Sequence, residues 1–443
     1  MVVDLLERVA DSRDPNNIAL VSGEWTWTVS ELGRLVDERV PALVGEGVSR
    51  GAVYPLVVET DPEGIATLLA CWRLGATAAP LNPRLTPVEQ SEARQALSDV
   101  EGDSQVILWT SGTSGRPRGV ALSDDNLMSS CEAVAERLEL RPSDCWLATL
   151  SMAHVGGLVL VVRALMTGAT LVAPGRLDTP QQSAQIDGTS EDGGSPRPVT
   201  HMSLVPTQLL RLLEYRDGRA PPSTFRCALI GGAHAPPDLV ARATEDGWPL
   251  ALTYGMTEMS SQVATAAPAL VRAKPGTVGP PLRGVELEIA AGGEILLRGA
   301  TRAVGYLGPG ASDICDQEGW YHTGDFGRLD EDGDLWVTGR RADRIVSGGV
   351  TIDATEVEQA VRTNPGVADV CVVGLEDSEW GQVVAAAVVA CADGVDQSEL
   401  EAEVSMRLSS AKRPKVWRLL PLLPRNANGK VDRAAVQELF RSG

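Results

Sequence analysis

Residues 109–120 read WTSGTSGRPRGV and combine four hydroxyl side chains, three glycines and two arginines in one short run. The apolar run VILWT at 106–110 predicts a strand that leads into it. Beyond it, Ser123 is a suitable N-cap for a helix whose first turn carries Asp124 and Asp125. The run is therefore expected to join a strand to a helix.

A loop of this composition suits the binding of phosphate groups. Glycine lets the backbone approach a ligand closely, and each backbone N–H directs a partial positive charge toward it. The run does not have the GxxxxGK[ST] spacing of a P-loop nucleoside triphosphatase. Taken alone it would also fit a merely flexible turn, so its assignment depends on the rest of the chain.

Apolar runs near residues 53–58, 106–109, 145–150 and 169–173 alternate with helical patterns, which predicts an α/β fold. Residues 174–198 are poor in apolar side chains and rich in Gly, Ser, Pro and Asp, so we expect a surface excursion without regular structure there.

A break at GRRADRIVSGG, residues 339–349, precedes a helix–strand–strand pattern typical of a small α+β unit. We therefore predict a large amino-terminal domain over residues 1–340 and a small carboxy-terminal domain over residues 341–443.

Composition excludes several classes of protein. A net charge of -20 and a pI near 4.7 argue against nucleic acid or an anionic membrane surface as the main partner. The apolar stretches are too short for a membrane span, and the first fifteen residues lack the pattern of a signal peptide. Seven cysteines scattered without a CxxC pair fit a reduced, cytoplasmic interior with no zinc site.

Only four residues are lysine, namely Lys274, Lys412, Lys415 and Lys430. This scarcity makes a lysine at a motif position more informative. The segment from Met406 to Arg433 carries eight basic residues against one acid, a local reversal of the overall charge. It suits an anionic partner, and a solvated basic face is the alternative interpretation.

Four further motifs follow the first run, namely GGAHAPP at 231–237, YGMTE at 254–258, WYHTGDFGRLDEDGDLWVTGR at 320–340 and NANGK at 426–430. With TSGTSGRPRGV they resemble, in order and spacing, the motifs of the adenylate-forming superfamily of acyl-CoA synthetases, luciferases and peptide-synthetase adenylation domains. The resemblance implies a large nucleotide-binding domain of several subdomains and a small mobile α+β domain. It also implies ATP and Mg²⁺ as cofactors.

The same resemblance assigns roles to individual residues. The β and γ phosphates would be held by Thr110, Ser111, Gly112, Thr113, Ser114 and Gly115. Arg118 stands where the family usually has lysine, which keeps the charge but changes its geometry. The remaining nucleotide contacts would come from Gly232, Tyr254 against adenine, Gly255, Thr257 on the phosphates, Glu258 on Mg²⁺, Asp325 on the ribose hydroxyls, and Arg340.

Lys430 carries the chemistry that the resemblance implies for the acid. A cation that bridges the attacking carboxylate and the α-phosphate offsets their repulsion in the transition state. Gly348 and Gly349, in the SGG turn, would line the tunnel for the pantetheine arm of coenzyme A. At the hinge position of the family, usually Asp or Lys, this chain has Ala342. The difference weakens the assignment of Ala342 as the hinge more than the expected rotation of the small domain, because a hinge depends on the backbone rather than on one side chain.

Four segments, at residues 151–169, 201–214, 254–262 and 274–289, look most like those of the o-succinylbenzoate–CoA ligases of menaquinone biosynthesis. His154 would contact the aromatic acid, and small residues would leave room for a ring, namely Gly156, Gly157, Ser260 and Ser261. Arg163 and Arg211 are both candidates for the second carboxylate, and the sequence does not choose between them.

The sequence therefore predicts an ATP- and Mg²⁺-dependent acid–CoA ligase that acts through an acyl-adenylate, with o-succinylbenzoate as the acid. The alternatives are another aryl- or acyl-CoA synthetase, or an adenylation enzyme that loads a carrier protein. The expected partners are a small carboxylic acid, ATP and coenzyme A, with no nucleic acid and no membrane insertion. A homodimer is one of the expected assemblies.

Overall fold

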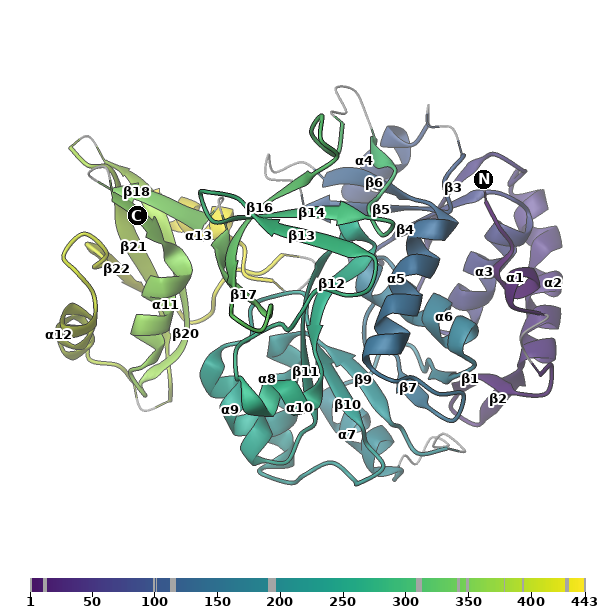
Figure 1. Ribbon diagram of the computed structural model, residues 1–443, viewed down its shortest axis with the longest axis horizontal. Helices are drawn as coiled ribbons and strands as arrows, with labels where there is room; N and C mark the ends of the chain where they lie inside the picture. Colours follow the sequence, from purple (N-terminus) through teal and green to yellow (C-terminus); the bar gives the residue numbers. More distant parts are fainter. Residues whose placement is uncertain are drawn as a thin grey trace. The chain divides into compact units, whose positions relative to one another are not determined.

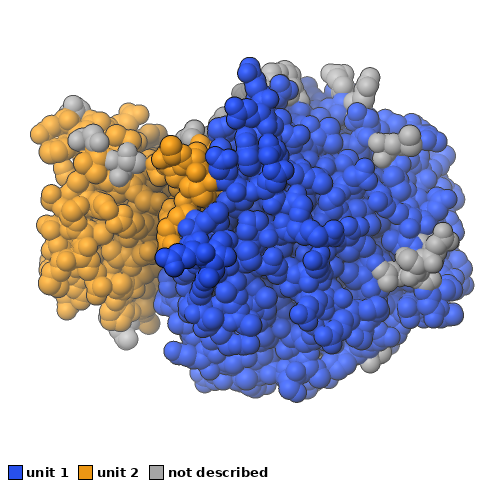
Figure 2. All heavy atoms as spheres, in the orientation of Figure 1, with its two compact units in different colours: residues 1–288, 296–322, 329–336 blue, residues 289–295, 323–328, 337–443 orange. Residues whose placement is uncertain are grey.

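The computed structural model describes residues 2–10, 14–98, 100, 102–111, 117–189, 197–307, 313–340, 343–347, 350–377, 379–392, 394–426 and 430–441. Contacts divide the chain into two compact units (Figure 2). Unit 1 comprises residues 1–288, 296–322 and 329–336, and unit 2 comprises residues 289–295, 323–328 and 337–443. The α/β fold class predicted from the sequence is confirmed, while the domain boundary at 340/341 stays a prediction.

An eight-stranded sheet forms the centre of unit 1, in the order β12-β11-β10-β9-β7-β8-β1-β2 (Figure 1). Its strands are β1 (Ile18–Ser22), β2 (Trp25–Thr28), β7 (Cys145–Leu147), β8 (Thr170–Val172), β9 (His201–Leu204), β10 (Cys227–Ile230), β11 (Leu250–Met256) and β12 (Ser261–Ala266). The central pairs are parallel, and only the outermost pair at each edge is antiparallel. The inner strands are buried along their whole length, as expected for parallel strands covered on both faces.

A five-stranded sheet in the order β15-β6-β5-β4-β3 carries the quoted run. Its strands are β3 (Val53–Val57), β4 (Thr77–Leu81), β5 (Val106–Ser111), β6 (Pro117–Leu122) and β15 (Gly305–Leu307). The expected strand-to-helix connection is wrong, because β5 and β6 form an antiparallel hairpin before the helix begins. Residues 119–122 are all buried in that pairing, and the glycine and proline of the segment conceal the strand in the sequence.

The helices of unit 1 are α1 (Leu5–Ala10), α2 (Val29–Gly45), α3 (Pro62–Arg73), α4 (Pro87–Ala96), α5 (Asp124–Arg137), α6 (Val155–Thr167), α7 (Thr179–Asp187), α8 (Pro206–Arg216), α9 (Pro237–Glu245) and α10 (Pro268–Ala273). As predicted, Ser123 caps α5, where its hydroxyl accepts a hydrogen bond from the Asn126 N–H. Within the described part of the chain, no helix is long and apolar enough to cross a membrane.

Helix α7 corrects the expectation that residues 174–198 lack regular structure. Asp178 caps the helix, Ile186 is buried, and Arg216 donates a hydrogen bond of 2.8 Å to Ser183. The buried face of α7 is therefore largely polar, and a search for apolar periodicity overlooks it. Residues 190–196 lie outside the described part of the chain.

A four-stranded sheet, in the order β13-β14-β16-β17, follows in the chain. Its strands are β13 (Val285–Ile289), β14 (Glu294–Gly299), β16 (Tyr321–Leu329) and β17 (Leu335–Arg340).

The carboxy-terminal part of unit 2 has its own sheet, in the order β19-β18-β21-β20 with β22 paired to β21. Its strands are β18 (Arg344–Ser347), β19 (Val350–Asp353), β20 (Val367–Asp377), β21 (Gly381–Ala390) and β22 (Val416–Leu419), and its helices are α11 (Ala354–Arg362), α12 (Gln397–Arg407) and α13 (Arg433–Arg441). Alternate residues of β20 face opposite sides. Val370 and Val372 pack with α11 and α12, and Cys371 and Val373 pack with α13. The predicted helix–strand–strand pattern is confirmed.

Candidate functional site

The hairpin of β5 and β6 presents the ends of the predicted phosphate loop. Thr110 pairs with Arg118 across the hairpin, and the Thr110 hydroxyl donates to the Arg118 carbonyl oxygen at 3.4 Å. Gly112, Thr113, Ser114 and Gly115 lie outside the described residues, as does the side chain of Ser111, so their phosphate contacts stay predictions. The structure thus places the two residues that flank the loop.

The predicted nucleotide residues after β10 and within β11 lie at one edge of the eight-stranded sheet. β10 and β11 are parallel, with Ile230 opposite Leu252, so Gly231, Gly232 and Tyr254 follow at the same carboxyl edge. Gly232 has a φ of +78°, a conformation that favours glycine. The carboxyl edge of a parallel sheet is where α/β proteins bind their ligands.

The YGMTE segment forms a sharply bent turn between β11 and β12, with a short 3₁₀ helix, η1 (Thr257–Met259), at its apex. A Cβ atom at Gly255 would lie 1.9 Å from the Ser261 carbonyl oxygen, so only glycine fits there. Ser260 and Ser261 have φ angles of 53° and 106°, which are strained for residues with side chains. The turn therefore holds Thr257 and Glu258, both half-buried, in a fixed position.

Glu258 is held from two directions. The Ala303 N–H donates to its carbonyl oxygen at 2.9 Å, and the Tyr306 hydroxyl donates to its side-chain Oε1 at 3.1 Å. The Tyr306 hydroxyl also lies 3.4 Å from that of Tyr321. Burial, with Glu258 adding to it, raises the pKa of Tyr306 to about 12, so the phenol stays protonated at neutral pH. Mg²⁺ takes oxygen ligands such as carboxylates, so the Glu258 side chain offers a suitable ligand atom, and its role on Mg²⁺ stays a prediction.

Three of the five tyrosines of the chain meet around this turn, namely Tyr254, Tyr306 and Tyr321. From the sequence, a role was expected only for Tyr254. The scarcity of tyrosine, like that of lysine, was the available signal for Tyr306 and Tyr321.

The predicted acid site begins where β7 ends. His154 is the N-cap residue of α6, and its Nε2 lies 3.4 Å from the Nδ2 of Asn82, a buried residue that follows β4. A Cβ atom at Gly157 would lie 2.2 Å from the Ser151 carbonyl oxygen, and the Ser260 hydroxyl donates to the Thr301 carbonyl oxygen. The small size of these two residues thus serves the packing of the protein itself. Asn82 is a candidate that sequence analysis did not assign.

Neither candidate arginine for the second carboxylate is supported by its position. Arg163 is 1% exposed and lies over the Trp146 ring at 5.3 Å, and Trp146 of β7 stacks on His201, the first residue of β9. It therefore lies toward the amino ends of these strands, opposite the site. Arg211 is exposed on α8, which packs inward through Leu209, Leu212 and Leu213. The residue that binds a second carboxylate is thus unassigned.

In unit 2 the predicted ribose and catalytic residues lie close together. The Arg340 Nε donates to Asp325 Oδ1 at 2.5 Å, and Asp325 is 5% exposed. The Lys430 N–H donates to Asn426 Oδ1 at 3.1 Å. Although Lys430 is exposed as a whole, desolvation of its ammonium group and the nearby Arg340 lower its pKa, and Asp325 opposes them. Lys430 therefore lies within electrostatic reach of both residues.

The other carboxy-terminal predictions have mixed outcomes. Gly348, Gly349 and Ala342 lie outside the described residues, so their roles stay predictions. Much of the basic segment is engaged within unit 2 through the ion pairs Lys412–Glu356, Arg425–Asp369 and Arg433–Glu358. Lys415 lies over the Trp380 ring at 3.9 Å. The segment is therefore less available to an anionic partner than its composition indicates.

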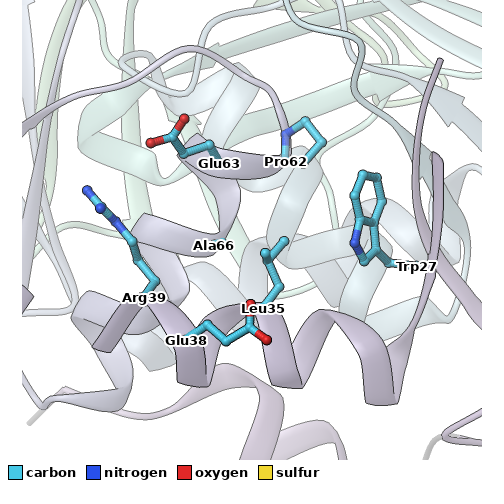
Figure 3. A pocket seen from close by; sticks show the side chains of 7 residues that line it. All are labelled: Trp27, Leu35, Glu38, Arg39, Pro62, Glu63 and Ala66. Atoms are coloured by element: carbon cyan, nitrogen blue, oxygen red, sulfur yellow. The ribbon is translucent and has the colours of Figure 1, made fainter. Parts of the chain in front are cut away.

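A pocket of about 320 Å³ lies away from these residues (Figure 3). It is lined by Trp27, Leu35, Glu38, Arg39, Pro62, Glu63 and Ala66 from β2, α2 and α3. Its two carboxylates disfavour a polyphosphate, and none of the predicted site residues lines it.

Comparison with known proteins identifies relatives along nearly the whole chain. Residues 6–101 and 88–307 match the family described as AMP-binding enzyme, and residues 356–430 match its C-terminal domain. The 2-succinylbenzoate–CoA ligase of Bacillus cereus (strain ATCC 14579) is 33% identical in an alignment that covers 96% of this chain and 96% of that protein. That of Bacillus pumilus is 31% identical and covers 95% of this chain and 94% of its own.

Solved structures give the same result. The o-succinylbenzoate CoA synthetase of Bacillus subtilis in complex with the acyl-adenylate OSB-AMP superimposes with a TM-score of 0.87 at 29% identity, over 99% of this chain and 98% of that chain. The same enzyme in complex with ATP and magnesium ion gives a TM-score of 0.86 at 29% identity, over 97% of this chain and 98% of that one.

Proposed function

Because the chain belongs to the AMP-binding enzyme family, we propose that it joins o-succinylbenzoate to coenzyme A, using ATP and Mg²⁺ and an acyl-adenylate intermediate. The observation that carries the proposal is the end-to-end similarity to 2-succinylbenzoate–CoA ligases, at 33% identity over 96% of both chains. The placement of the motif residues around the sheet edge and around Asp325 supports it.

In the first half-reaction, a carboxylate oxygen of the acid attacks the α-phosphorus of ATP, and pyrophosphate leaves. Arg118 and the loop beside it bind the β and γ phosphates, and Tyr254 lies against the adenine. Asp325 accepts hydrogen bonds from the ribose, and Lys430 bridges the carboxylate and the α-phosphate. Mg²⁺, held by Glu258, would neutralise charge on the phosphates when bound.

In the second half-reaction, the sulfur of coenzyme A attacks the acyl carbon, AMP leaves, and the thiol proton passes to solvent. Gly348 and Gly349 line the path of the thiol arm in this proposal. Rotation of the carboxy-terminal domain between the two half-reactions would move Lys430 away from the reacting carboxyl group and bring the turn with Gly348 and Gly349 to it. His154 and Asn82 position the aromatic acid in both steps.

The reaction is tested by mass spectrometry of the products formed from ATP, Mg²⁺, coenzyme A and a panel of acids. The panel contains o-succinylbenzoate, benzoate and a medium-chain fatty acid. A thioester of o-succinylbenzoate alone supports the proposal. Thioesters of other acids only would keep the mechanism and discard this acid, whereas adenylate without thioester would favour a carrier protein as the acceptor.

Two finer predictions belong to the same proposal. Free, scattered cysteines and the use of ATP and coenzyme A fit a cytoplasmic enzyme. A homodimer is testable by sedimentation at several protein concentrations.

A further inference from the structure

The segment from Thr301 to Leu307 connects two parts of the candidate site that are far apart in sequence. The Val304 N–H donates to the Ala121 carbonyl oxygen at 2.9 Å, and Tyr306 pairs with Val120 of β6. The same segment holds Glu258 through the Ala303 N–H. It therefore joins the strand that leaves the phosphate loop to the turn that carries the magnesium ligand.

Tyr306 makes this connection with its side chain as well. Its hydroxyl donates to Glu258 Oε1 at 3.1 Å, and the Arg118 guanidinium lies over its ring, with Cζ 5.7 Å from the ring centroid. A phenol hydroxyl can donate a hydrogen bond and an ionised carboxylate can only accept one, so Tyr306 is the donor to Glu258.

We propose that Tyr306 is a positioning residue for adenylation, which sets Glu258 through its hydroxyl and Arg118 through its ring. The proposal rests on the function proposed above, in which Glu258 binds Mg²⁺ and Arg118 binds phosphate. A carboxylate that receives one fixed hydrogen bond keeps its remaining lone pairs directed at the metal. A guanidinium over an aromatic face is likewise restricted in direction. Tyr306 thus fixes the position of Glu258, which binds the metal, relative to Arg118, which binds phosphate.

The two contacts can be separated by substitution. Tyr306→Phe removes the hydroxyl and keeps the ring under Arg118, whereas Tyr306→Leu removes both. Tyr54→Phe is the matched control, because the Tyr54 hydroxyl also donates to a carboxylate, that of Glu46, and the pKa of Tyr54 is likewise raised to about 12. Tyr54 lies in β3 of the same sheet and outside the proposed site.

Pyrophosphate release is measured against Mg²⁺ and ATP concentration. For Tyr306→Phe, the Mg²⁺ concentration that gives half-maximal adenylation should rise about tenfold, as expected for loss of a hydrogen bond to a charged group. The KM for ATP should change little in this variant and should rise in Tyr306→Leu. Thioester formation from supplied acyl-adenylate should stay unchanged in both, because neither Glu258 nor Arg118 acts in that step.

A second readout does not depend on turnover. Binding of Mn²⁺ in the presence of a non-hydrolysable ATP analogue, followed by electron paramagnetic resonance, should weaken about tenfold in Tyr306→Phe and remain unchanged in Tyr54→Phe. Equal Mn²⁺ affinity in Tyr306→Phe and the wild type would overturn the proposal, and so would a parallel loss of both half-reactions. A wild type that adenylates no acid would instead overturn the proposed function, and the Mn²⁺ titration would still decide the role of Tyr306.

Discussion

Gly156 and Gly157 are adjacent in the first turn of α6, yet alanine should affect them in opposite ways. At Gly157 a Cβ atom would lie 2.2 Å from the Ser151 carbonyl oxygen, a backbone atom, whereas at Gly156 its nearest neighbour is the Leu150 Cδ1 at 3.4 Å. An ordinary carbon–oxygen contact is about 3.3 Å or longer, so Gly157→Ala must displace the Ser151 carbonyl by about 1 Å. At Gly156 an ordinary contact results.

The energies follow from these distances. Overpacking of this kind costs about 1–3 kcal/mol, and alanine returns at most about 1 kcal/mol of helix propensity. Gly157→Ala should therefore lower the free energy of unfolding by up to about 2 kcal/mol, and Gly156→Ala should leave it unchanged or raise it by up to about 1 kcal/mol. Because helix propensity cancels between them, Gly157→Ala should be about 1–3 kcal/mol less stable than Gly156→Ala. The Ser151 carbonyl also accepts a hydrogen bond from the His154 N–H at 3.1 Å. Its displacement should move His154 and raise the KM for the acid in Gly157→Ala alone.

Urea unfolding followed by tryptophan fluorescence measures the stability of both variants, and initial rates of thioester formation give the KM for the acid. The adjacent substitution is the control, because helix propensity acts on both positions alike. If Gly157→Ala proves as stable as Gly156→Ala, or binds the acid as well as the wild type does, the steric argument is wrong.

The remaining predictions concern three charged residues. Lys430→Ala should abolish adenylation and spare thioester formation from supplied acyl-adenylate, and equal loss of both would refute its role. Since the pKa of Lys430 is lowered, its charge is lost as pH rises through a value below the ordinary lysine range, so wild-type adenylation should decline there, as a pH–rate profile would reveal. Arg163→Met should leave the KM for o-succinylbenzoate unchanged, and a raised KM would restore the role of Arg163 in binding the second carboxylate. The free energy of unfolding should stay the same or rise by up to about 2 kcal/mol, because the substitution removes a buried guanidinium whose nitrogens lack hydrogen-bond partners among the described residues. The Lys274 ammonium contacts the carboxylates of Asp330, Asp332 and Asp334 at 2.5–3.0 Å. Lys274→Met should lower the Tm because it leaves these carboxylates without their cation, and added Ca²⁺, which takes carboxylate ligands, should raise the Tm of the variant. A Tm of the variant that does not respond to Ca²⁺ would contradict this.

The family, the α/β fold class and the small carboxy-terminal helix–strand–strand unit were all predictable from the amino-acid sequence. These depend on short-range patterns, such as apolar periodicity, the Ser123 cap and ordered motifs, each of which is complete within a few neighbouring residues. The α7 helix and the β5–β6 hairpin were not predicted, because a polar buried face and a strand that contains proline and glycine weaken those patterns.

Which side chains contact one another became known only from the folded structure. Tyr306 contacts Glu258 across 48 positions of sequence, and His154 meets Asn82 across 72. Arg163 looked available for a ligand until its burial over Trp146 placed it at the opposite end of the strands. Much of the basic carboxy-terminal segment likewise became internal ion pairs. Burial and pairing depend on how distant elements pack, and no local pattern of residues records that.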